Sequence, residues 1–127
     1  MPLRTQGKRM LEFQNNPVVE VISDDLVKLK EGFILKYWDY TFIIPAGYES
    51  DFASVPRLPI VYRLFANKAK KSAIYHDFAY STQLFSREEC DKAFLCAMRE
   101  ENLPEWICQA MYMGVRIGGA SHYNKQG

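Results

Sequence analysis

A change of hydrophobic pattern between residues 56 and 67 constrains the fold more than any other feature of this sequence. Residues 11–56 alternate apolar with polar positions and are rich in β-branched and aromatic side chains, as β-strands are. From about residue 67 the apolar residues recur at the three- and four-residue spacing of amphipathic helices. The sequence therefore predicts an α+β protein, with a small N-terminal antiparallel sheet followed by a three-helix unit.

Turn-forming pairs divide the predicted sheet into strands. Residues 24–25 (DD) separate PVVEVIS from LVKLK, and residues 31–32 (EG) lead from LVKLK into FILKYWDYTFIIP. That last run is long enough to contain a bend of its own, which we place near residues 38–39 (WD). The pattern favours consecutive antiparallel strands joined by short turns.

Three helices are expected between residues 67 and 119. The second begins at Ser86, whose hydroxyl can accept from the N–H of Glu89 while the Glu89 carboxylate returns to the N–H of Ser86. Pro104 suits the first turn of the third helix, and the two glycines at residues 118–119 suit its end.

The chain has the size of one domain. Its 127 residues, of which 48% are hydrophobic, are enough to bury a single core. We therefore predict one domain spanning residues 1–127. Within it, residues 1–10 form a flexible or partner-binding arm, residues 11–56 form the sheet and residues 67–119 form the helices.

Charge, cysteine content and hydropathy exclude several classes of protein. The net charge of +1 gives no electrostatic footprint for nucleic acid. The three cysteines, an odd number without CxxC spacing, are expected to be free thiols in a reducing compartment. The N-terminus lacks the apolar core of a signal peptide, and no stretch approaches the ~18 apolar residues of a membrane span. Any contact with lipid would therefore be transient.

The segment AIYHDFAYSTQLFSREECDKAF carries the most informative polar residues. His76 and Tyr80 are four residues apart on the first helix and share a face with Ala69 and Ala73. On the second helix, Asp91 falls inside the apolar arc, where a carboxylate is costly unless it is paired. We therefore predict that Asp91 is buried and hydrogen-bonded to the His76 imidazole.

Two interpretations of this pair are open. A hydrolytic site needs a base that titrates near neutral pH and a carboxylate that orients it, and His76 with Asp91 and Tyr80 supplies both as catalytic residues. Structural networks make the same arrangement, so the pair could equally be a buried clasp that only holds the two helices together.

Asp51 and Asp77 are the candidate metal ligands. Together with His76 they could form a small oxygen-and-imidazole site for a divalent metal, as in hydrolytic zinc or manganese centres. The alternative is that Asp51 and Ser54 cap loop N–H groups while Asp77 pairs with Arg57.

The combined motifs resemble the domain-of-unknown-function family 1353, whose members are common in tailed phages and prophages. The resemblance rests on IIPAGYESDFASVPR, on AIYHDFAYSTQLFSREECDKAF and on MYMGVRIGG, and covers roughly residues 30–122. The departures, at Tyr48, Ser50 and Cys90, remove no polar group. For a phage-type protein, the apolar helix at residues 106–117 fits a virion or tail-assembly accessory component, which we expect in the host cytoplasm during assembly or in the virion. Because no signal peptide is evident, secretion through one is not expected.

A second resemblance, limited to four positions, is to phospholipase A-two proteins. By that similarity His76 would deprotonate water, Asp91 would hold the histidine tautomer, Tyr80 would support the pair and Asp77 would bind calcium. The glycine-rich calcium loop of that family is not evident in this chain. The resemblance implies a small, metal-assisted, phospholipase-like hydrolase, and the alternative is a non-catalytic phage protein with a His76–Asp91 clasp.

The helix at residues 106–117 is apolar around much of its circumference. We expect it to pack on both the His76 helix and the Asp91 helix, and to meet phage structural subunits or a second copy of the chain with its remaining apolar face. His122, in the tail SHYNKQG, is expected to be exposed. The expected stripe comprises Trp106, Ile107, Ala110, Met111, Gly114 and Val115.

Overall fold

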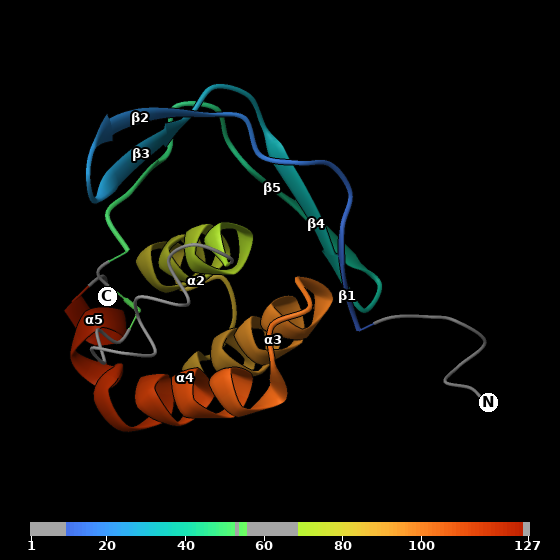
Figure 1. Ribbon diagram of the computed structural model, residues 1–127, viewed down its shortest axis with the longest axis vertical. Coiled ribbons are helices and arrows are strands. Elements are labelled where there is room, and N and C mark those ends of the chain that lie inside the picture. Colours follow the sequence, from blue (N-terminus) through green and yellow to red (C-terminus); the bar gives the residue numbers. More distant parts are fainter. Residues whose placement is uncertain (1–9, 53, 56–68, 126–127) are drawn as a thin grey trace.

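The computed structural model describes residues 10–52, 54–55 and 69–125, and the predicted N-terminal arm lies almost wholly outside these residues. In Figure 1 the strands form one layer and the helices lie on one side of it. The α+β class is confirmed, with strands early in the chain and helices after them.

Six strands form two three-stranded antiparallel sheets, ordered β1-β4-β5 and β2-β3-β6. The predicted turns at residues 24–25 and 38–39 are confirmed, because they join the β2–β3 and β4–β5 hairpins. The strands are β1 (Leu11–Phe13), β2 (Val19–Ser23), β3 (Leu26–Leu29), β4 (Phe33–Tyr37), β5 (Tyr40–Ile44) and β6 (Glu49–Ser50).

The single sheet expected from the sequence is divided at residues 31–32. There β3 and β4 take different partners instead of pairing with each other. The Asn15 side chain sits beside this junction, donating to the Gly32 carbonyl (3.0 Å) and accepting from the Ile34 N–H (2.8 Å). The amide of Asn15 thus provides hydrogen bonds for two backbone groups at the point where the chain passes from one sheet to the other.

The expected three-helix unit is present as α2 (Lys70–Thr82), α3 (Arg87–Glu100) and α4 (Glu105–Gly118), followed by a short α5 (Ala120–Lys125). Ser86 caps α3 as predicted, since its side chain accepts from the N–H of Glu89 at 3.2 Å. The additional helix forms because the C-terminal tail docks on the core. The Tyr123 hydroxyl donates to the Phe85 carbonyl (2.9 Å), and its ring packs edge-on against Tyr80.

The N-terminus of α2 is capped from the end of α3. Ala69, at the N-cap, has no side chain that can accept a hydrogen bond. The Glu101 carboxylate accepts instead from the N–H groups of Lys71 (3.3 Å) and Ser72 (2.9 Å) and from the Ser72 hydroxyl (2.5 Å). These bonds fix α2 against α3, the two helices that carry the predicted site.

The packing of α4 differs from the sequence prediction. It lies along α3, whereas the short α5 lies against both α2 and α4. The buried face of α4 includes Ile107, Met111 and Val115, as expected, but Trp106 is 56% exposed. Because α3 covers one side of α4, part of the predicted stripe faces solvent. The longest helices described have 14 residues, and none of them is long and apolar enough to cross a bilayer.

Candidate functional site

A fully buried carboxylate, Asp91 on α3, is the centre of the site. Its Oδ1 atom accepts from His76 Nε2 (2.8 Å) and from the Tyr80 hydroxyl (2.6 Å). Its Oδ2 atom accepts from Arg116 Nη1 on α4 (2.7 Å). The predicted hydrogen bond between His76 and Asp91 is confirmed, and α2, α3 and α4 all contribute to this one carboxylate.

The donors determine the electrostatics of Asp91. Burial raises the pKa of its carboxyl group, but the hydrogen bonds from His76, Tyr80 and Arg116 outweigh burial and leave the pKa below its ordinary value. Burial, and then the hydrogen bond to Asp91, raise the pKa of Tyr80. At neutral pH the centre therefore holds an ionised Asp91 beside a protonated phenol.

Both ring nitrogens of His76 are engaged. Because the ionised Asp91 can only accept, Nε2–H of His76 donates to it. In the neutral tautomer Nδ1 then carries a lone pair, which faces the Ser54 Oγ atom at 3.0 Å. The ring packs against Tyr80 and Phe94, with centroid distances of 4.1 and 4.4 Å, so its orientation is fixed on both faces.

Asp77, the next residue on α2, anchors the segment after β6. Its Oδ1 atom accepts from the N–H of Ser54 (3.0 Å) and contacts the Ser54 hydroxyl closely, while its Oδ2 atom accepts from the Ser50 hydroxyl (2.5 Å). Ser54 therefore lies between His76 and Asp77, and links the strand half of the chain to the helices.

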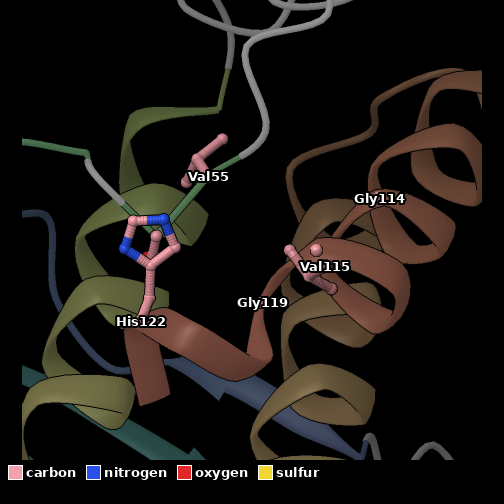
Figure 2. Close-up of a pocket in the computed structure, with 7 residues that line it drawn as sticks. Val55, Gly114, Val115, Gly119 and His122 are labelled. Atoms are coloured by element: carbon pink, nitrogen blue, oxygen red, sulfur yellow. The ribbon is translucent and has the colours of Figure 1, made fainter. Parts of the chain in front are cut away.

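A cavity of about 80 Å³ lies beside Ser54. Figure 2 shows it between the segment carrying Val55, the end of α4 and the His122 side chain of α5. Ser54 is 8% exposed. His122 is half-buried, so the expectation of an exposed His122 is wrong, because docking of the tail turns α5 towards this cavity. The lining residues are Ser54, Val55, Gly114, Val115, Gly118, Gly119 and His122.

The model of one protein family, described as "Protein of unknown function (DUF1353)", matches residues 27–115. The chain belongs to this family. The match spans the segment from β3 to the last turn of α4, and so includes every side chain of the network around Asp91 except Arg116. Neither the search of curated proteins nor the search of solved structures found a significant match.

The candidate metal ligands of this DUF1353 member have other contacts in the structure. Both Asp77 oxygens accept from Ser50 and Ser54, while Asp51 is exposed. Asp51 and Asp77 are close enough to Tyr48 for both to raise its pKa, after the larger effect of burial. Across residues 10–52, 54–55 and 69–125, no three His, Cys, Asp or Glu side chains are grouped to hold a metal ion. Arg57, the alternative partner of Asp77, lies outside the described residues.

Sequence reasoning missed Arg116 as part of the site. It stands in line with polar Glu105, Gln109 and Tyr112 on the helical wheel, a pattern that predicts a solvated edge. In the structure Arg116 is half-buried, and Arg87 fixes the end of α4 by donating to the Arg116 carbonyl (2.6 Å). The predicted burial of Asp91 implies a cationic partner, but it does not identify which arginine that partner is.

We expect the stability that Asp91 contributes to be lost in acid. Its folded-state pKa is lower than the ordinary 3.8, so the unfolded chain binds more protons at low pH. The free energy of unfolding of the wild type should therefore exceed that of the Asp91→Asn variant by a constant amount near neutral pH. This difference between the two proteins should shrink as the pH falls below 3.8. Urea titrations of both proteins between about pH 6 and about pH 2.5 measure it. A difference independent of pH would contradict this assignment.

Proposed function

We propose that this chain is a phage-encoded accessory or virion protein that carries a small hydrolytic centre for ester cleavage. In this centre His76 is the general base, Asp91 orients it and Tyr80 supports Asp91. The observation that carries the proposal is the alignment of carboxylate, imidazole and hydroxyl, with Asp91 Oδ1 at 2.8 Å from Nε2 and Ser54 Oγ at 3.0 Å from Nδ1 of His76. A base within hydrogen-bond reach of an O–H group is the first requirement of such catalysis.

The phospholipase-like part of the proposal is supported by Tyr80 as well as by the His76–Asp91 pair. Its hydroxyl donates to the same Asp91 oxygen that accepts from His76, which is the supporting role implied by that resemblance. A calcium ion at Asp77, also proposed from the resemblance, would have to replace the hydrogen bonds from Ser50 and Ser54.

The phage setting is proposed from the family resemblance and from the surface of α4. Trp106, Met113 and Ile117 are exposed, and their spacing of seven and four residues places them on one helix face. Such a stripe is suited to contact with another virion subunit or a second copy of the chain. We therefore assign association to α4, on the face opposite to the one that packs on α3.

A second candidate function is a purely structural clasp, and complete burial favours it. His76 and Asp91 both have 0% relative exposure, and each polar atom of the two side chains has a partner. The network ties the Ser54 segment, α2, α3 and α4 into one unit. A protein that must remain folded in a particle could retain it for that reason alone.

Ester hydrolysis by the purified full chain distinguishes the two functions. The substrates are p-nitrophenyl acetate, p-nitrophenyl butyrate and phosphatidylcholine vesicles with and without calcium. We expect hydrolysis above the buffer rate on at least one of them, and a loss of about 100-fold or more in His76→Gln. The exposed-site variant Glu88→Gln, on α3 but with its side chain 63% exposed, should match the wild type. A wild-type protein inactive on all three substrates would leave the clasp as the function.

A further inference from the structure

We propose that Ser54 is the nucleophile of this centre and carries a short acyl group during turnover. The inference rests on the hydrolase function proposed above. In it the Ser54 hydroxyl, and not a free water molecule, attacks the substrate. It arises from the position of the Ser54 hydroxyl, which occupies the place facing His76 Nδ1 where an activated water would otherwise lie. Asp91, His76 and Ser54 then act in sequence as orienting carboxylate, base and nucleophile.

The Ser54 hydroxyl proton faces two acceptors. One is the lone pair of His76 Nδ1, at 3.0 Å from Oγ, and the other is the Asp77 Oδ1 atom, which lies closer. A serine hydroxyl has one hydrogen, so it can donate to only one of them at a time. When the hydroxyl donates to Nδ1, the imidazole is the base that can take its proton.

The backbone holds Ser54 in place for this role. Its N–H donates to Asp77 at 3.0 Å, and the next N–H, of Val55, donates to the Phe52 carbonyl at 3.1 Å. Phe52 has a φ of 58°, a left-handed conformation that is uncommon for an aromatic residue and persists only where surrounding contacts enforce it. The turn therefore presents the hydroxyl to α2 in one orientation.

The chemical step balances without a cofactor. Ser54 Oγ attacks the ester carbonyl carbon, and its proton passes to His76 Nδ1 while Nε2–H remains bonded to Asp91. The tetrahedral intermediate expels the alcohol, which takes the proton from Nδ1 and leaves an acyl ester on Ser54. Water then attacks that ester while Nδ1 takes one of its protons. As the carboxylic acid leaves, Nδ1 returns this proton to Ser54 Oγ and restores the hydroxyl.

The cavity limits the acyl group to a short one. Its volume is about 80 Å³, roughly half that of an engineered apolar cavity of about 150 Å³ that binds benzene. Val55 and Val115 give it apolar walls, and Gly114, Gly118 and Gly119 contribute no side chains beyond a hydrogen. An acetyl or propionyl group fits within such a space, whereas the longer acyl chain of a phospholipid would have to extend beyond it. The substrate class is therefore esters of short carboxylic acids.

The test is acid-quenched turnover of p-nitrophenyl acetate by the full chain. We expect a burst of p-nitrophenolate close to one equivalent, and an acetyl group that peptide mapping places on Ser54. Ser54→Ala should lose the burst and at least about 100-fold in kcat/KM. Ser54→Cys, which keeps a nucleophile of similar size, should still acylate, and Ser81→Ala, a half-buried serine on the same α2 helix as His76, should behave as the wild type.

The outcomes separate this inference from the function on which it rests. Turnover without an acetyl group on Ser54, with Ser54→Ala still active, would overturn the nucleophile and leave His76 activating water. No turnover and no acetyl group on Ser54 in the wild type would overturn both. The mapping uses the wild-type chain, so the answer does not depend on whether Ser54→Ala folds.

Discussion

Replacing Asp91 with alanine is expected to lower the free energy of unfolding by about 3–5 kcal/mol, the usual cost of breaking a buried ion pair. The change removes the acceptor shared by His76 and the Tyr80 hydroxyl, and both of these side chains are buried. Arg116 is less affected, because its side chain is 31% exposed and can turn to solvent. Urea denaturation followed by circular dichroism measures the loss.

Glu88→Ala is the matched control for this prediction. Glu88 lies on the same helix, and its side chain is 63% exposed in a surface pair with Lys92. Its removal should cost no more than about 0.5 kcal/mol. Equal destabilisation by the two substitutions would show that the Asp91 network contributes nothing specific to the fold.

Gly119→Ala is expected to destabilise the protein by about 1–3 kcal/mol through overpacking. A Cβ atom at this position would lie 2.5 Å from the Val115 carbonyl oxygen and 2.7 Å from the Tyr80 hydroxyl. The carbonyl belongs to the backbone of α4 and cannot move away cheaply. The hydroxyl is the one that donates to Asp91, so the substitution should also disturb the site.

Gly118→Ala provides the comparison within the same glycine pair. A Cβ atom there would meet no atom of the described residues within 4 Å outside its own stretch of helix. Because alanine favours helix more than glycine does, the free energy of unfolding should be unchanged or higher by up to about 1 kcal/mol. Thermal melts of both variants measure the contrast, and equal melting temperatures would contradict the close approach at Gly119.

Local patterns in the sequence were enough to predict strands β2 to β5 and helices α2 to α4, but not the short elements β1, β6 and α5. The β2–β3 and β4–β5 hairpins follow from period-two alternation around two short turns, and the start of α3 follows from Ser86. The division into two sheets was not predictable, because it depends on which distant strands pair, β1 with β4 and β6 with β3. Turn chemistry at residues 31–32 carries no information about those partners.

The sequence predicted only those parts of the site that depend on which face of a helix a residue occupies. The burial of Asp91 and its bond to His76 follow from helical periodicity. Ser54 and Arg116 come from segments far away in the sequence, so their approach depends on tertiary packing. Because His76 is fully buried, its replacement should lower the free energy of unfolding substantially whether the pair is catalytic or structural. Chemistry at Ser54, not stability, distinguishes the two functions.

The most direct test of the central claim is kcat/KM of Asp91→Asn on p-nitrophenyl acetate, measured where both proteins are folded. In the wild type Asp91 accepts from Nε2–H and so leaves the Nδ1 lone pair for Ser54. An asparagine amide can donate to Nε2, which would place the proton on Nδ1 and block transfer from the hydroxyl. We predict a fall of about 10²–10⁴ in kcat/KM. An equal kcat/KM in the two proteins would contradict the account.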